Sequence, residues 1–143
     1  MKPWLFRIMF SLSALLIAAA PAHSARPSKP LTLFNDNPIS TTSGKSLSTT
    51  EIDQAIIRAG KERDWNITSN GDGTLKARLS VRTHILEVQI RVKSTSYDVV
   101  YTDSSNLGYA PNPEDPGRPL IHPAYNKWVQ NLVGDINREF SRL

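Results

Sequence analysis

Residues 74–92 read TLKARLSVRTHILEVQIRV, and apolar and polar side chains alternate along almost all of this segment. The alternation places one set of apolar residues on one face and charged residues on the other, which is typical of β-strands that bury a single face. It is interrupted once, around Arg82 and Thr83. We therefore expect two antiparallel strands, one from Thr74 to Arg82 and one from His84 to Val92.

The neighbouring segments extend this pair in both directions. Residues 65–69 precede Asn70-Gly71-Asp72-Gly73, a strong hairpin signal because tight turns need the positive φ angles that Asn, Asp and Gly tolerate. Residues 97–102 alternate again after a short polar turn. The pattern predicts a four-stranded antiparallel meander with one solvent-exposed face.

Helical patterns lie on both sides of the meander. Ser48 and Glu51 have the spacing of a capping box, and an apolar stripe follows it to about residue 63. After Pro123, which suits a first helical turn, a longer stripe runs from Tyr125 to Leu143. Since each helix has one apolar face, we expect both to pack on the same side of the sheet, giving an α+β fold.

The first residues have the order of a secretory signal peptide. Lys2 and Arg7 precede an apolar run of about 13 residues, and small residues follow the run. The run is shorter than a membrane span. The alternative interpretation is an uncleaved membrane anchor. Removal of residues 1–24 takes away Lys2 and Arg7 and lowers the formal net charge from +4 to +2, too small a surplus to indicate nucleic-acid binding.

The chain has no cysteine, so neither a disulfide nor a lipid-modified cysteine is available to it. We therefore expect a protein of the periplasm, or a secreted one, with no stable membrane anchor after cleavage. Residues 25–46 are rich in Pro, Ser and Thr and predict a flexible tether, although residues 31–34 can dock as an added strand. Residues 47–143 would form one domain, interrupted by a Pro-rich loop at 110–119.

Two segments of this domain carry a family resemblance. Residues 97–109 read YDVVYTDSSNLGY and residues 121–129 read IHPAYNKWV. With parts of the helix at 55–60 and the strand junction at 82–84, they resemble an uncharacterised family of small exported proteins and lipoproteins of Gram-negative bacteria. The resemblance covers roughly residues 51–143. It implies a helix, antiparallel strands and a helix in the cell envelope, and it implies no activity and no catalytic residues. This chain differs from the lipoprotein members in lacking the acylated cysteine, and its Pro-rich loop is long for the group.

The densest polar cluster falls in those same segments. If the loop folds back, strand end and helix start come together, and Ser104, His122 and Asp103 then have the residue types of a nucleophile, a base and an orienting acid. The stronger interpretation is turn chemistry and helix capping, because Asp, Ser and Asn readily hydrogen-bond nearby backbone. The candidate binding residues of this cluster are Asp103, Ser104, Asn106, Tyr109, His122, Tyr125 and Asn126.

A second candidate surface is the solvent-exposed sheet face. Glu87 interrupts a basic patch there, which favours an ordinary solvated face over a site for an anionic partner. The basic residues of this patch are Lys76, Arg78, Arg82 and Arg91. Neither the histidines nor any other residues show the spacing of a metal site, and we expect no cofactor.

These observations favour a non-catalytic binding or accessory protein of the cell envelope, with a protein, peptide or glycan as its partner. The alternative is a small periplasmic hydrolase that uses Asp103, Ser104 and His122. Exposed strand edges would also permit a homodimer. Whether Ser104 and His122 come within hydrogen-bonding distance distinguishes the two functions.

Overall fold

The computed structural model describes residues 28–143. The expected signal peptide and the first residues of the expected tether lie outside this range. The elements, in chain order, are β1 (Lys29–Pro30), β2 (Phe34–Pro38), α1 (Thr49–Lys61), β3 (Asn66–Ser69), β4 (Thr74–Val81), β5 (His84–Val92), β6 (Ser96–Ser105), β7 (Leu120–Ile121) and α2 (Ala124–Ser141).

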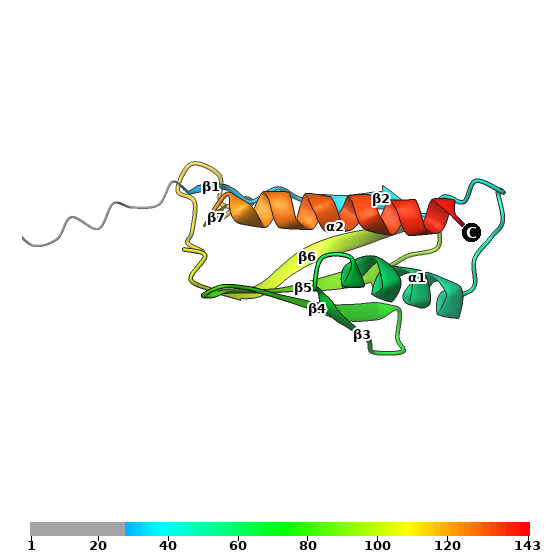
Figure 1. Ribbon diagram of the computed structural model, residues 1–143. Coiled ribbons are helices and arrows are strands. Elements are labelled where there is room, and N and C mark those ends of the chain that lie inside the picture. Colours follow the sequence, from blue (N-terminus) through cyan, green and yellow to red (C-terminus); the bar gives the residue numbers. More distant parts are fainter. Residues whose placement is uncertain (1–27) are drawn as a thin grey trace, which may run out of the picture.

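The fold is α+β, with a five-stranded antiparallel sheet in the order β2-β6-β5-β4-β3 and a two-stranded sheet formed by β1 and β7. The expected meander is present as β3 to β6. The expectation of four strands was incomplete, because β2 adds a fifth strand next to β6, with Phe34 opposite Val99 and Asn37 opposite Tyr97. Both helices lie on the same side of this sheet (Figure 1).

Residues 28–46 differ from the expected flexible tether. They contribute β1 and β2, and Leu31 is only 5% exposed within the core. The Leu31 N–H donates to the carbonyl of Pro119, and the Leu31 carbonyl accepts from Arg118 Nε. Composition alone underestimated how ordered this segment is. Its backbone groups bond to groups from distant parts of the chain, and these contacts offset the entropy lost on ordering.

The start of α1 follows the sequence closely. The Ser48 hydroxyl accepts from the Glu51 N–H, and the Glu51 carboxylate accepts from the Ser48 N–H at 2.9 Å, which completes the capping box. The buried face of α1 then approaches β3 closely at Gly60. A Cβ atom there would lie 2.4 Å from the Cδ1 atom of Ile67, so any larger residue would force Ile67 to shift.

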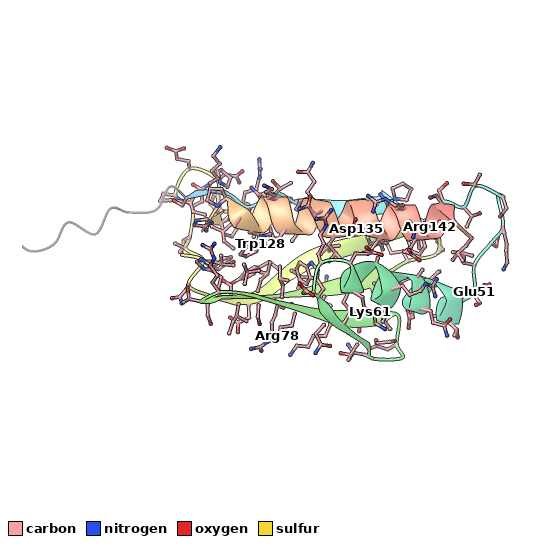
Figure 2. The ribbon with its side chains drawn as sticks, viewed as in Figure 1. Glu51, Lys61, Arg78, Trp128, Asp135 and Arg142 are labelled. Carbon is pink, nitrogen blue, oxygen red and sulfur yellow. The ribbon has the colours of Figure 1, made fainter. Side chains whose placement is uncertain are left out.

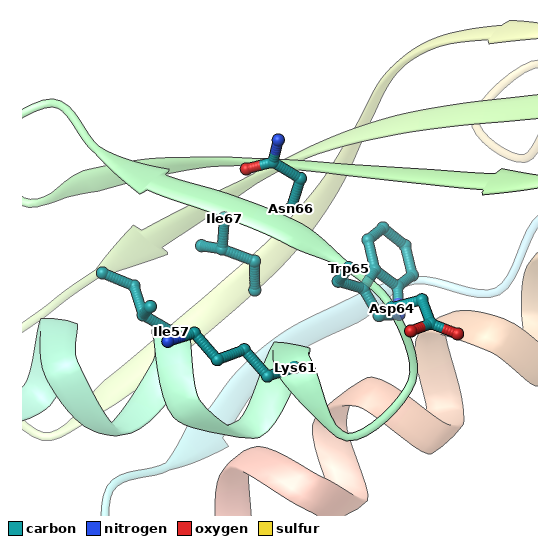
Figure 3. A pocket seen from close by; sticks show the side chains of 6 residues that line it. All are labelled: Ile57, Lys61, Asp64, Trp65, Asn66 and Ile67. Atoms are coloured by element: carbon teal, nitrogen blue, oxygen red, sulfur yellow. The ribbon is translucent and has the colours of Figure 1, made fainter.

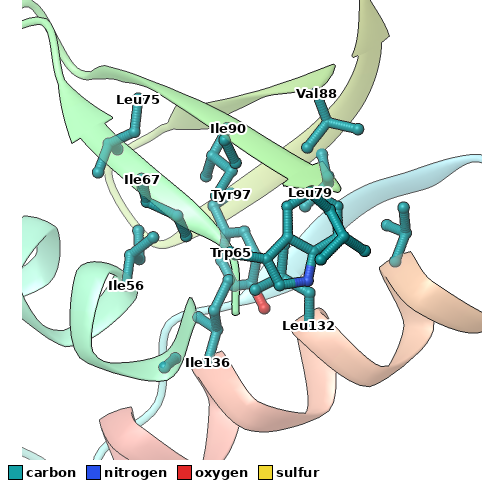
Figure 4. Close-up of a cluster of buried hydrophobic side chains, with 14 of the residues drawn as sticks. Ile56, Trp65, Ile67, Leu75, Leu79, Val88, Ile90, Tyr97, Leu132 and Ile136 are labelled. Carbon is teal, nitrogen blue, oxygen red and sulfur yellow. The ribbon is translucent and has the colours of Figure 1, made fainter. Parts of the chain in front are cut away.

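The core lies between the sheet and the two helices (Figure 4). Leu75, Ala77 and Ile90 point from the sheet into it and are fully buried, while Ile136 and Phe140 come from α2. Each fully buried Leu, Ile or Phe side chain stabilises the fold by about 1.5–3 kcal/mol. The core is therefore formed largely by the apolar residues of the alternating strands and of the helical stripe that the sequence predicts.

Ion pairs join the two helices. Asp135 of α2 is 3% exposed and pairs with Arg63, which follows α1, and with Arg138 one turn further along. Glu139 pairs with Arg58 of α1 and with Arg142. The Arg63–Asp135 and Arg58–Glu139 pairs hold α2 against α1.

Candidate functional site

The Ser-His-Asp arrangement that the alternative interpretation required is not formed. Ser104 Oγ lies 2.8 Å from the Tyr101 hydroxyl, and its backbone N–H donates to Asp103 Oδ1. His122 Nδ1 accepts from the N–H of Ala124 at the start of α2, so its contact is to backbone. Among residues 28–143, no hydrogen bond joins Ser104 to His122. The geometry therefore fits turn formation and helix capping, the stronger interpretation of these residues.

Asn106 also has an architectural position. It adopts a positive φ of 60°, and its Nδ2 donates to the carbonyl of Thr83 in the β4–β5 turn. The Asn106 carbonyl lies 2.8 Å from His84 Nδ1. Since a carbonyl only accepts, His84 carries its proton on Nδ1 in this contact. Asn106 thus ties the end of β6 to the β4–β5 turn.

Asn126 holds the N-terminal segment in place. Its Oδ1 accepts from the Thr32 N–H at 2.8 Å, and its Nδ2 donates to the Pro30 carbonyl at 3.2 Å. The side-chain amide therefore bonds the N–H of one residue and the carbonyl of another in the same segment, as the backbone of a neighbouring strand would. Its role is to fix residues 30–32 against the start of α2.

Tyr109 and Tyr125 belong to a cluster of three tyrosines. The rings of Tyr101 and Tyr109 are stacked, with centroids 4.3 Å apart and an interplanar angle of 2°. Tyr125 meets Tyr101 edge-on at 6.0 Å. Positive φ angles at Asn106 and Gly108 turn the chain so that Tyr109 folds back over β6. Offset-stacked and edge-to-face pairs of this kind stabilise one another by about 0.5–1.5 kcal/mol.

These tyrosines line a hollow of about 140 Å³ at the junction of the N-terminal segment, β6 and the Pro-rich loop. We call it the tyrosine hollow. None of its lining residues is charged. They are Leu31, Thr32, Leu33, Asn35, Val99, Val100, Tyr101, Tyr109, Pro119 and Tyr125.

The rim and the interior of the tyrosine hollow differ in exposure. Leu33 is 55% exposed and Tyr109 is 46% exposed, although both are large apolar side chains. Tyr125 is fully buried, and its hydroxyl has no hydrogen-bond partner among the described residues. Burial raises the pKa of the Tyr125 hydroxyl above its ordinary value, and burial also raises that of Tyr101. Both hydroxyls therefore keep their protons at neutral pH.

Glu87 pairs with two of the basic residues on the exposed sheet face and balances part of their charge. Glu87 pairs with Arg78 at 2.9 Å and with Lys76 at 3.3 Å, and Arg91 Nε donates to Gln89. Partial burial of Glu87 acts to raise its pKa, but hydrogen bonds from Lys76 and Arg78 outweigh it and the pKa is lowered. Figure 2 shows Arg78 on the side of the sheet opposite Asp135. Arg82 lies in the β4–β5 turn with φ 54°.

Sequence reasoning identified Tyr109 and Tyr125 but missed Tyr101 and the apolar rim. The available signal was the apolar pair Leu31 and Leu33, which flank a single threonine in a segment otherwise rich in breakers. In the described chain, no three His, Cys, Asp or Glu residues gather to hold a metal ion, and no helix is long and apolar enough to cross a membrane. No family model, no curated protein and no solved structure matches this chain.

Proposed function

We propose that this chain is an exported, non-catalytic binding protein of the cell envelope, and that the tyrosine hollow holds an apolar side chain of a protein or peptide partner. The observation that carries the proposal is the exposed apolar rim of Leu33 and Tyr109 around a hollow with no charged lining residue. Exposed apolar residues gathered around one hollow are typical of interaction sites, whereas scattered ones are common on any surface.

The chemistry of the lining narrows the partner. With no charged side chain, the tyrosine hollow offers nothing to balance a phosphate or a carboxylate. A sugar ring would bring several hydroxyls into a hollow with few polar groups. Each hydroxyl buried there without a hydrogen-bond partner would cost about 1–3 kcal/mol of binding free energy. An apolar side chain suits the site better, because it needs no polar partner and adds to the apolar rim formed by Leu33 and Tyr109.

The contacts of Ser104 and His122 support binding over hydrolysis. Ser104 is hydrogen-bonded to Tyr101 at 2.8 Å, and His122 accepts from a backbone N–H, so neither activates the other. We therefore expect Ser104→Ala and His122→Ala to leave partner binding intact. A substrate whose hydrolysis is lost in both variants would favour the hydrolase instead.

The proposal can be tested in cells that export the protein. A photo-crosslinking amino acid is placed at residue 33, at residue 109 or, as the control, at residue 91 on the exposed sheet face. We expect one shared adduct at positions 33 and 109 that is absent at 91.

Two outcomes would overturn the site. Adducts found only at residue 91 would move binding to the basic sheet face, and equal adducts at all three positions would indicate nonspecific contact. Localisation is tested in the same cells by osmotic shock, which should release a shortened chain with the periplasmic fraction. Retention of the full-length chain in the membrane would support the uncleaved anchor.

A further inference from the structure

The two edges of the five-stranded sheet are unlike each other. At the β2 edge, Pro38 has no N–H to donate, Asp36 takes a positive φ of 55°, and the register with β6 shifts between Phe34 and Asn37. Proline and bulges are devices that prevent a strand from pairing with another chain. The β3 edge, Asn66–Ser69, contains no proline and no charged residue, and no described strand pairs with its outer side.

The backbone groups that face outward from β3 can be identified. The Asn70 N–H donates to the Thr74 carbonyl, which makes Asn70 and Thr74 a hydrogen-bonded pair of the β3–β4 hairpin. Because hydrogen-bonded pairs recur at every second residue of an antiparallel ladder, Thr68 also bonds inward to β4. The N–H and C=O groups of Ile67 and Ser69 therefore point to the open edge.

A groove of about 360 Å³ runs between this edge and α1 (Figure 3). Ile57 and Lys61 line it from the helix, and Ile67 lines it from the strand. Asp53 lies on the same helical face, since residues 53, 57 and 61 are each four apart. This stripe on α1 is acidic at one end, apolar in the middle and basic at the other.

The ends of the stripe have unused capacity. Lys61 is exposed and forms no ion pair among residues 28–143. Asp53 is partly exposed and forms no ion pair in the described chain, and its Oδ2 atom accepts from Ser69 Oγ at 2.5 Å. The stripe is therefore self-complementary. When a twofold axis passes through its centre, the acidic end of one copy meets the basic end of the other.

The strand and the stripe share the same centre. Asp53 contacts Ser69, and Gly60 lies against Ile67, so Ile57 falls at the level of Thr68. A twofold axis at Thr68 places Ile67 opposite Ser69 of the partner subunit, which matches their outward backbone groups. The same axis places Ile57 against its own copy and Lys61 near Asp53 of the partner subunit.

We propose that the occupant of this groove is a second copy of this chain, joined by antiparallel β3–β3 pairing and by the charge-complementary stripe of α1. The sheet then continues across both copies, with the two α1 helices side by side over the junction. The tyrosine hollow is not part of the interface, so this proposal stands or falls separately from the proposed function.

Charge exchange tests the proposal sharply. The purified protein should behave as a dimer in light scattering and sedimentation across a wide range of protein concentration. Lys61→Asp leaves two acids on each stripe, and Asp53→Lys leaves two bases, so each variant should dissociate at least about tenfold more readily. An equimolar mixture of the two variants should recover the dimer mass, because an all-acidic stripe then faces an all-basic one.

The matched control is Arg91→Glu, which makes the same change in charge as Lys61→Asp on the exposed sheet face and should leave the dimer intact. Thermal unfolding of each variant checks that it is folded. If Asp53→Lys does not fold, Lys61→Asp alone tests the interface. A monomer at every concentration overturns the proposal. So does a dimer that Lys61→Asp does not weaken, since it would use another surface.

Discussion

The Asp135 carboxylate on α2 accepts a hydrogen bond at 2.7 Å from Nε of Arg63, which lies just beyond the C-terminus of α1. The carboxylate is almost fully buried, whereas the Arg63 side chain is about half exposed. The acid is therefore the vulnerable partner, because its charge has little access to water if its hydrogen bonds are lost.

The first prediction concerns this buried acid. Asp135→Asn should lower the free energy of unfolding by about 1–3 kcal/mol, because it leaves Arg63 and Arg138 without their counter-charge and weakens two hydrogen bonds. Arg63→Ala should cost less, since Arg138 still pairs with the carboxylate at 2.9 Å. Urea unfolding followed by the fluorescence of buried Trp65 measures both. Equal losses in the two variants would show that the acid itself is not the sensitive partner.

The second prediction compares two glycines in helices. At Gly60 a Cβ atom would lie 2.4 Å and 2.9 Å from two atoms of Ile67, so Gly60→Ala should destabilise the fold by about 1–3 kcal/mol through overpacking. At Gly134 on α2 no atom lies within 4 Å of that position, so Gly134→Ala should stabilise by about 0.5–1 kcal/mol. Thermal and urea unfolding distinguish the two. Partial rescue of Gly60→Ala by Ile67→Val would confirm the contact.

The third prediction compares two buried tyrosines. The Tyr97 hydroxyl bonds Asn137 Oδ1 at 2.9 Å, whereas the Tyr125 hydroxyl has no partner in the described chain. Tyr97→Phe should therefore cost about 1 kcal/mol, and Tyr125→Phe should be neutral or stabilising in the isolated protein. Unfolding experiments without any partner give the comparison. An equal loss for Tyr125→Phe would mean that its hydroxyl is already satisfied.

The fourth prediction is a pH dependence at the capping box. A hydrogen bond from Lys45, followed by those from Ser48, lowers the pKa of Glu51 from 4.5 to about 2. A carboxyl whose pKa is lower when folded adds stability above its unfolded pKa, and this stability is lost as the pH falls through the folded value. The difference in unfolding midpoint between the natural chain and Glu51→Gln should therefore be full at neutral pH and shrink between pH 4.5 and 2. A difference that stays constant over that range would contradict the prediction.

The sequence predicts the parts of this fold that depend on local pattern. The alternation across residues 74–92 becomes β4 and β5, and the Ser48–Glu51 spacing becomes a capping box, because strand faces and helix caps are set by neighbouring residues. The strand β2 depends instead on β6, about 60 residues away along the chain. The residues of β2 have a weak intrinsic preference for the strand conformation, so composition alone favoured a tether.

The candidate site shows the same division. The side-chain hydrogen bonds of Asp103, Ser104 and His122 join groups within three residues, as their types favour in turns and caps. The tyrosine hollow requires Tyr109 to fold back on Tyr101 and Leu31 to arrive from the N-terminal segment. Nothing in the spacing of these residues indicates that contact, because it is produced by the turn at Asn106 and Gly108 and by long-range docking.

The clamp that Asn126 places on Pro30 and Thr32 has a consequence for the order of folding. Its two hydrogen bonds span 94 and 96 positions of the chain, and β1 finds its partner only at Leu120 and Ile121. Contacts of such long range form late, since the entropy of closing the loop is lost before they are gained. A chain that emerges N-terminus first therefore keeps residues 28–32 without these partners until the start of α2 has followed, and those residues stay accessible to a chaperone or protease throughout that interval.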